Sequence, residues 1–200
     1  IFTAMVFDGL DGRVARMTNT QSDFGVQYDS LSDMVSFGVA PAVVAYGWGV
    51  SDLGKLGLAA AFVYASCAAL RLARFNVQAE SSDGKVFTGL PSPAAAALVA
   101  GFVWSTYDLA PSVALSVLGA VLTAAVGLLM VSNFKYPSFK EVDLRGKVPF
   151  IVILAVAMGF VVITIDPPRI LFMLATFFSF SAPLIWLAKK LGLSALGKSE

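Results

Sequence analysis

The residues with the clearest capacity for chemistry lie near the start of the chain, in the stretch FDGLDGRVARMTNTQSDFGVQYDSLSDM. This stretch, residues 7–34, carries five aspartates, although only 14% of the chain's 200 residues are charged and 58% are hydrophobic. The chain has no histidine and a single cysteine, Cys67. Without imidazole or paired thiolates, carboxylates are left to perform any acid, base or metal chemistry. The five aspartates are Asp8, Asp11, Asp23, Asp29 and Asp33.

Four of these aspartates have helical spacing if one helix runs through Arg16 and the next begins nine residues later. Asp8 and Asp11 are three residues apart on the first helix, and Asp29 and Asp33 are four residues apart on the second. Two antiparallel helices would bring the four carboxylates face to face. Because close carboxylates repel one another, the arrangement requires cations, and oxygen ligands alone select Mg²⁺, Mn²⁺ or Ca²⁺. We therefore expect the four carboxylates to share two divalent ions.

Small residues and one arginine accompany the carboxylates. Gly12, Ala15 and Gly25 leave side-chain volume empty, which lets a flat or phosphorylated ligand approach the backbone. Arg16 adds a bidentate donor suited to a phosphate oxygen. Metal-binding carboxylates, an arginine and an open backbone together indicate phosphoryl-group transfer, in which metal ions neutralise phosphate oxygens.

The elements that must position these residues are membrane helices. The mean hydropathy is +0.80, and the charged fraction is far below the roughly 25% of soluble domains, so the sequence predicts an all-α, polytopic membrane helical bundle. Apolar residues before Asp8 predict the end of a longer helix, and we expect an N-terminal helix to be missing. Six further apolar runs are predicted to be spans, over residues 30–50, 56–72, 92–107, 112–131, 148–165 and 170–188.

The basic residues predict the orientation of this bundle. If each run crosses the membrane once, 12 of the 14 basic residues fall on the side that holds the aspartates. Loops rich in lysine and arginine face the cytoplasm. We therefore expect an integral protein of the cell inner or plasma membrane, with the aspartates at the cytoplasmic surface.

The aspartate stretch resembles a known family. Eight fixed positions across 26 residues match D-x2-D-G-x2-A-R-x8-G-x3-D-x3-D, the signature of the CDP-alcohol phosphatidyltransferases. The resemblance implies a six-helix core, here with extra C-terminal helices, in which a CDP-linked lipid gives its phosphatidyl group to an alcohol and releases CMP. It implies one transmembrane catalytic domain over residues 1–200, with the metal and CDP site in residues 1–36, and a homodimer.

The resemblance also implies a role for each matching residue. Asp8, Asp11 and Asp29 would hold metal, Mg²⁺ or Mn²⁺ with Ca²⁺ as an alternative. Asp33 would hold the second ion and act as the catalytic residue that accepts the proton of the attacking hydroxyl. The cytidine and pyrophosphate site would be lined by Gly12, Ala15, Arg16 and Gly25.

Three further stretches, SDMVSFGVAPA, CAALRLARFN and FTGLPSPAAA, resemble the membrane-embedded phosphatidylserine synthases. This resemblance implies CDP-diacylglycerol as donor, L-serine as acceptor and CMP as product, in contact with membrane lipids and without a nucleic-acid partner. The serine carboxylate would need a cationic partner, which an arginine supplies. The candidates for binding the acceptor or a donor phosphate are Arg71, Arg74, Asn76, Ser36 and Thr88.

Other interpretations stay open at this point. Arg71 and Arg74 could be anchors that bind lipid head groups. The acceptor could be glycerol 3-phosphate or an inositol phosphate, and a cation transporter is a more distant alternative that predicts acidic groups near the bilayer midplane. Asp23 lies outside the pattern and is expected to be solvated or to cap a helix. Pro41 is expected to kink its helix.

Overall fold

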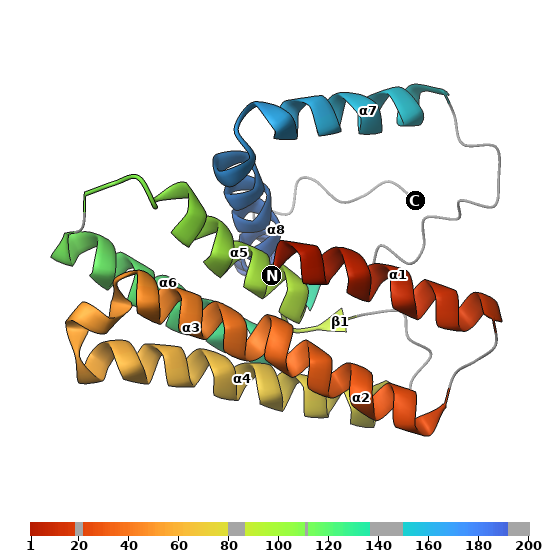
Figure 1. Ribbon diagram of the computed structural model, residues 1–200, viewed down its shortest axis with the longest axis horizontal. Coiled ribbons are helices and arrows are strands. Elements are labelled where there is room, and N and C mark those ends of the chain that lie inside the picture. Colours follow the sequence, from red (N-terminus) through yellow and green to blue (C-terminus); the bar gives the residue numbers. More distant parts are fainter. Residues whose placement is uncertain (19–21, 80–86, 111, 137–149, 192–200) are drawn as a thin grey trace.

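The computed structural model of the protein describes residues 1–18, 22–79, 87–110, 112–136 and 150–191. As the sequence predicts, these residues are almost entirely helical (Figure 1). The elements are α1 (Phe2–Thr18), α2 (Asp23–Asp33), the π-helix η1 (Met34–Val39), α3 (Ala40–Trp48), the 3-10 helix η2 (Val50–Leu53), α4 (Lys55–Ala79), β1 (Phe87–Thr88), α5 (Ser92–Ser105), α6 (Val113–Val131), β2 (Lys135–Tyr136), α7 (Phe150–Ile165) and α8 (Pro167–Lys190).

Apart from residues 148 and 149, which lie outside the described residues, the apolar runs predicted from the sequence lie mostly in helices, but several limits differ. The run at 30–50 is part of a longer helical segment, because α2, η1 and α3 follow one another without interruption. α4 extends seven residues beyond the predicted end at residue 72. α8 begins at Pro167 rather than at residue 170, because proline is well tolerated in the first turn of a helix. Hydropathy shows where a run of apolar residues ends, whereas the helix can continue through the polar residues that follow.

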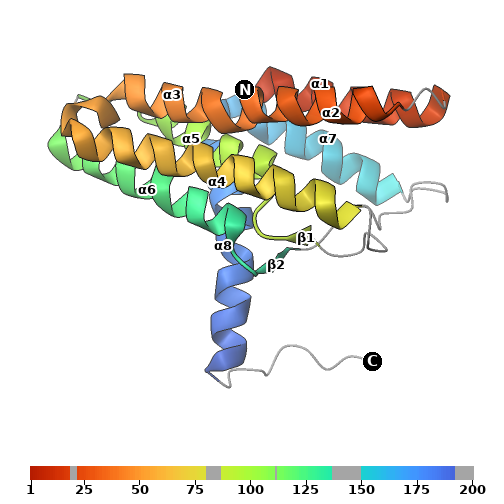
Figure 2. The ribbon, with the colours of Figure 1, turned by 90° about the horizontal axis from the view of Figure 1, so that it is seen from below.

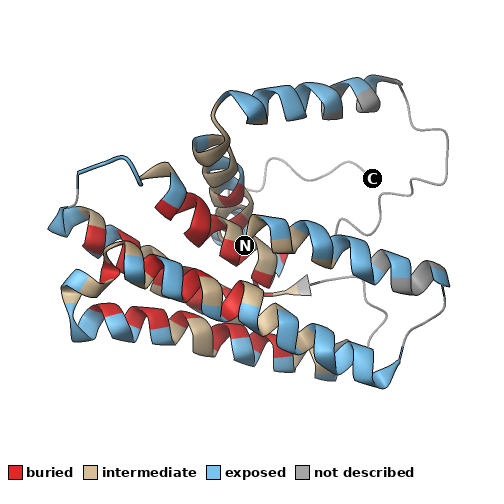
Figure 3. Ribbon diagram, in the orientation of Figure 1, coloured by how far each residue is buried: buried red, intermediate tan, exposed pale blue. Residues whose placement is uncertain are grey.

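The interior of the bundle is formed where α4, α5 and α6 meet, and their inner faces are buried (Figure 3). Gly127 on α6 allows a close approach to α4, since a Cβ there would lie 2.9 Å from the Cα of Tyr64. α5 also packs against α8, which projects away from the other helices at a steep angle (Figure 2). The two-residue strands β1 and β2 pair antiparallel and join the segments that follow α4 and α6.

Apolar side chains cover much of the outer surface. Among the described residues, three helical segments are long and apolar enough to cross a membrane: Lys55–Val77, Val113–Val131 and Pro167–Ala188. The described side chains of α7 are also largely exposed, including Phe160 and Ile165 (Figure 3). A soluble protein rarely exposes such extensive apolar surface. The protein is therefore a membrane protein, as predicted.

The π-helix η1 ends two residues before Pro41, the residue at which the sequence predicts a kink. Proline has no N–H to donate, so the carbonyl of Phe37 lacks its usual partner four residues later. The hydroxyl of Tyr64 on α4 donates a hydrogen bond of 2.9 Å to this carbonyl. Tyr64 thereby ties α4 to the π-helix that directly follows Asp33.

Pro183 creates the same situation inside α8. The carbonyl of Ser179 lies four residues earlier and lacks a backbone donor at that position. The buried Tyr136 of β2 donates its hydroxyl to this carbonyl at 2.7 Å. In both helices, a tyrosine hydroxyl from another element takes the place of the missing backbone donor.

Replacing Tyr64 by phenylalanine is expected to lower the free energy of unfolding by about 1–3 kcal/mol, because a buried carbonyl loses its donor. The midpoint of thermal unfolding in detergent should fall by roughly 2–4 °C for each kcal/mol. Tyr107→Phe is the matched control, because Tyr107 is exposed. Equal midpoints for the two variants would show that the Tyr64 hydroxyl does not stabilise the π-helical segment.

Candidate active site

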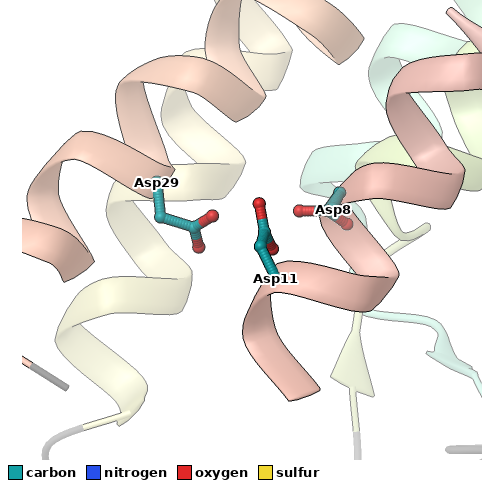
Figure 4. A group of neighbouring side chains, drawn as sticks. All are labelled: Asp8, Asp11 and Asp29. Atoms are coloured by element: carbon teal, nitrogen blue, oxygen red, sulfur yellow. The ribbon is translucent and has the colours of Figure 1, made fainter. Parts of the chain in front are cut away.

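Three of the predicted carboxylates converge between α1 and α2. Asp8 and Asp11 come from α1 and Asp29 comes from α2, and the two helices run antiparallel (Figure 1). One carboxylate oxygen from each residue lies within 4.8 Å of the other two. Figure 4 shows the three side chains pointing toward a common space from the two helices. The helical spacing in the sequence therefore predicts this arrangement correctly.

Asp33 extends the cluster one turn further along α2. Its carboxyl group is hydrogen-bonded to that of Asp8. This contact links the fourth predicted aspartate to the other three.

The cluster is electrostatically unfavourable when all of its members are ionised. Partial burial raises the pKa of Asp8 above its usual value, the hydrogen bond to Asp33 lowers it, and the negative charge of Asp11 raises it further. Burial also raises the pKa of Asp29, as do the negative charges of Asp8 and Asp11. A cation placed among these groups would remove the repulsion and favour the ionised forms.

The residues present fit a hard divalent cation. The donor set consists of carboxylate oxygens from Asp8, Asp11 and Asp29. Oxygen donors are the ligands preferred by Mg²⁺, Mn²⁺ and Ca²⁺, whereas zinc and copper sites usually include histidine or cysteine. The chain has no histidine, and its one cysteine is buried in α4.

The raised pKa values predict how stability depends on pH and on divalent cations. A carboxyl whose pKa is raised by folding stabilises the folded state below its unfolded pKa, and that contribution is lost as pH rises through the folded value. Without divalent cation, repulsion at the cluster should therefore grow above about pH 4. A cation that binds the ionised cluster should stabilise more at pH 8 than at pH 5, because fewer protons compete with it.

The measurement is the thermal unfolding midpoint with Mn²⁺ and with chelator at the two pH values. A cation at about 100 times its Kd contributes about 2.7 kcal/mol, which corresponds to roughly 5–10 °C for a chain of this size. Asp52→Asn, on the distant η2, is the control and should keep the full gain. An equal gain at both pH values would contradict the assignment of the ionised cluster as the binding site.

The structure places the predicted nucleotide-binding residues on the same two helices. A Cβ added to Gly12 would meet no atom within 4 Å, so the space beside Asp11 is open. Gly25 donates its N–H to the Oγ of Ser22, which caps the start of α2, at 3.1 Å. Ala15 and Arg16 belong to α1, but their side chains lie outside the described part of the structure. Asp23 is exposed in the first turn of α2, in agreement with the expectation that it is solvated.

Arg71, one of the predicted acceptor-binding residues, interacts electrostatically with this cluster through Asp33. Its side chain is buried on α4 and is attracted electrostatically to Asp33. Its Nη1 donates a 2.7 Å hydrogen bond to the hydroxyl of Ser92 at the start of α5. The guanidinium also lies 6.0 Å from the ring centre of Phe75. A buried guanidinium that is attracted to a carboxylate is more consistent with a site residue than with a lipid anchor at the surface.

Two other predicted acceptor residues are engaged elsewhere. Arg74 donates hydrogen bonds to the carbonyl of Val131 at 3.2 Å and to Oδ1 of Asn133 at 2.6 Å, beyond the cluster. Asn76 and Ser30 are hydrogen-bonded at 3.0 Å, which ties α4 to α2. These contacts join helices, and the part of either residue in ligand binding stays a prediction.

The last two acceptor candidates are partly buried. Ser36 lies in η1, three residues beyond Asp33. Thr88 lies in β1, paired with Lys135 of β2. Their roles also stay predictions.

Sequence reasoning did not single out Ser92 or Tyr64. Ser92 lies in the motif FTGLPSPAAA between two prolines, which is a typical helix start and carries no sign of a partner. The signal for Tyr64 was Pro41, which predicts a free carbonyl four residues earlier. The sequence could not show which side chain would satisfy that carbonyl.

Comparison with known proteins identifies the family to which the chain is similar. Residues 1–131, which contain the complete aspartate cluster, match the CDP-alcohol phosphatidyltransferase family. The chain is 40% identical over 164 residues to a CDP-diacylglycerol–serine O-phosphatidyltransferase of Helicobacter pylori, covering 80% of this chain and 68% of the relative.

Two relatives of the same name come from other organisms. The Methanocaldococcus jannaschii protein is 43% identical over 141 residues, covering 70% of this chain and 62% of the relative. The Bacillus subtilis protein is 38% identical over 141 residues, covering 70% of this chain and 74% of the relative.

Proposed function

This chain belongs to the CDP-alcohol phosphatidyltransferase family, and we propose that it transfers the phosphatidyl group of CDP-diacylglycerol to the hydroxyl of L-serine. The products are phosphatidylserine and CMP. The observation that carries this proposal is the convergence of Asp8, Asp11 and Asp29 from two antiparallel helices, with Asp33 hydrogen-bonded to Asp8. The three relatives are named as CDP-diacylglycerol–serine O-phosphatidyltransferases, which supports serine as the acceptor.

The four aspartates would hold two divalent ions, Mg²⁺ or Mn²⁺, with Ca²⁺ as the alternative. Bound there, the ions would neutralise the oxygens of the donor pyrophosphate. The contact between the carboxyl groups of Asp8 and Asp33 supports a role for both residues in this arrangement. Binding of a cation would favour the ionised carboxylates, which are the forms that act as ligands.

Asp33 is assigned the role of general base. It takes the proton of the acceptor hydroxyl while the hydroxyl oxygen bonds to the phosphorus of the phosphatidyl group. The bond from that phosphorus to the CMP oxygen breaks, and CMP leaves with the electron pair. The chain has no histidine, so a carboxylate is the natural group for this proton transfer.

The nucleotide would be bound beside the cluster by Gly12, Ala15, Arg16 and Gly25. The open space at Gly12 supports this assignment, because a flat group could approach the backbone there. Arg16 would supply a cation for a phosphate oxygen.

The position of Arg71 near Asp33 supports a place for it in acceptor or phosphate binding. Arg74, Asn76, Ser36 and Thr88 are weaker candidates for the same role. Two of them are already hydrogen-bonded between helices.

The proposal extends to the setting of the enzyme. Residues 1–200 would form one transmembrane catalytic domain whose metal and CDP site lies in residues 1–36. The domain would lie in the cell inner or plasma membrane with this site facing the cytoplasm, among membrane lipids, and would act as a homodimer. The unequal distribution of basic residues supports the orientation.

The direct test is release of CMP from CDP-diacylglycerol by the purified protein with Mn²⁺ or Mg²⁺. L-Serine, glycerol 3-phosphate and an inositol phosphate are compared as acceptors. Release with L-serine that is lost on chelation is the expected result. Release with one of the other acceptors would keep the chemistry and overturn the choice of acceptor, and no release with any acceptor would contradict the proposed function.

A further inference from the structure

Arg71 is a buried cation whose charge is incompletely matched. The residue is only 8% exposed. In the described part of the chain, no carboxylate lies within ion-pair distance of it, although Asp33 is near enough to attract it. Burying a guanidinium without an anionic partner is costly. The site therefore requires an anion beyond those that the described residues supply.

Ser92 accepts a hydrogen bond from one nitrogen of this guanidinium. Its hydroxyl accepts the 2.7 Å hydrogen bond from Nη1 of Arg71, and Ser92 itself is 1% exposed. Ser92 lies between Pro91 and Pro93, whose rings restrict the backbone at the start of α5. The hydroxyl is thus supplied from a rigid position on a different helix from Arg71.

A second donor of the guanidinium has no partner. Nε of Arg71 is buried and makes no hydrogen bond with any described residue. Buried polar atoms in folded proteins are usually paired, so an unpaired donor beside a reactive cluster marks the place of a missing ligand. Nη1 donates to Ser92, and Nε is a buried donor of the same guanidinium that is available to that ligand.

The position of Arg71 beside Asp33 indicates the chemistry of the ligand. If Asp33 takes the proton of the acceptor hydroxyl, the group attached to the neighbouring carbon of the acceptor lies within reach of Arg71. In a hydroxy amino acid, that neighbouring carbon carries a carboxylate, and a guanidinium is its preferred partner. The donor pyrophosphate would instead be held on the side of Asp8, Asp11 and Asp29.

We propose that Ser92 is a positioning residue for the acceptor: its hydroxyl fixes the Arg71 guanidinium so that the free Nε–H receives the carboxylate of the hydroxy amino acid. This inference rests on the proposed function. Ser92 affects the affinity for the acceptor through Arg71 and does not itself contact the reacting atoms.

The test is steady-state CMP release by the full chain, with L-serine varied at saturating CDP-diacylglycerol and then the reverse. Ser92→Ala should raise the KM for L-serine about tenfold, the equivalent of one lost charge-assisted contact. The kcat, the KM for CDP-diacylglycerol and the Mn²⁺ concentration for half-maximal CMP release should stay unchanged, because only acceptor binding is weakened. Ser92→Thr keeps the hydroxyl and should restore most of the affinity.

Ser116→Ala is the matched control, since Ser116 is equally buried but bonds within its own helix, at 3.3 Å to the carbonyl of Ser112. A raised KM for the donor would assign Arg71 to a donor phosphate and overturn the inference, as would an unchanged KM for L-serine. Should Ser92→Ala fail to fold, Ser92→Cys is measured against the same criteria. Wild-type protein that is inactive with every acceptor would instead contradict the proposed function itself.

Discussion

Asp33→Asn is expected to reduce turnover with L-serine by about 10²–10⁴-fold, the usual contribution of a general base. Asparagine keeps the shape of the side chain and its ability to hydrogen-bond to Asp8, but it cannot accept the proton of the acceptor hydroxyl. Binding of CMP in the presence of Mn²⁺ should be largely retained, because Asp8, Asp11 and Asp29 still converge. Turnover is measured as CMP release, and nucleotide binding as thermal protection by CMP.

Asp23→Asn is the matched control for this variant. Asp23 lies on the same helix but is exposed in its first turn, outside the cluster. Its removal changes the net charge by the same amount and should leave turnover unaltered. Turnover of Asp33→Asn close to that of the wild type would remove Asp33 from the role of base.

Asp29→Asn is expected to weaken the affinity of the site for the metal. High metal concentrations should still support some CMP release. Asp29 is the member of the converging group that comes from α2, so its loss leaves Asp8 and Asp11 of that group, together with Asp33, to hold the metal as proposed. The Mn²⁺ concentration for half-maximal CMP release should rise at least about tenfold, the equivalent of 1.4 kcal/mol of binding free energy. High Mn²⁺ should recover part of the activity.

Asp8→Asn should also raise the Mn²⁺ concentration for half-maximal CMP release, because it removes another carboxylate of the converging group. Asp52→Asn again serves as the charge control on a distant element. Metal titration curves of Asp29→Asn and Asp8→Asn that superimpose on the wild-type curve would exclude these residues as ligands.

The sequence was sufficient to predict the convergence of three aspartates. Residues three or four apart on a helix share a face regardless of what surrounds the helix. Two such helices joined by a short polar segment run antiparallel, so the spacing of Asp8 and Asp11 and the position of Asp29 already determine that the carboxylates meet. The membrane character followed from composition alone, because long apolar helices have few alternatives.

The sequence was not sufficient to distinguish between the two arginines of CAALRLARFN. Arg71 and Arg74 lie three residues apart, and the sequence alone gives both side chains the same capacity to bind an anion. The structure directs Arg71 toward Ser92 and Asp33, whereas Arg74 bonds to the residues at the end of α6. That difference depends on which neighbouring helices pack against α4, and packing is not encoded in the spacing of two residues.

The residues of the aspartate stretch by themselves determined the family, the metal-binding chemistry to be expected and the helical face that carries it. Only the tertiary structure decided which partners complete the site. Ser92 comes from α5 and reaches Arg71 across 21 positions of sequence, and Tyr64 from α4 reaches the carbonyl of Phe37 that Pro41 leaves free. Contacts within a helix follow from its fixed periodicity, whereas contacts between helices depend on how the buried faces of α4, α5 and α6 fit together.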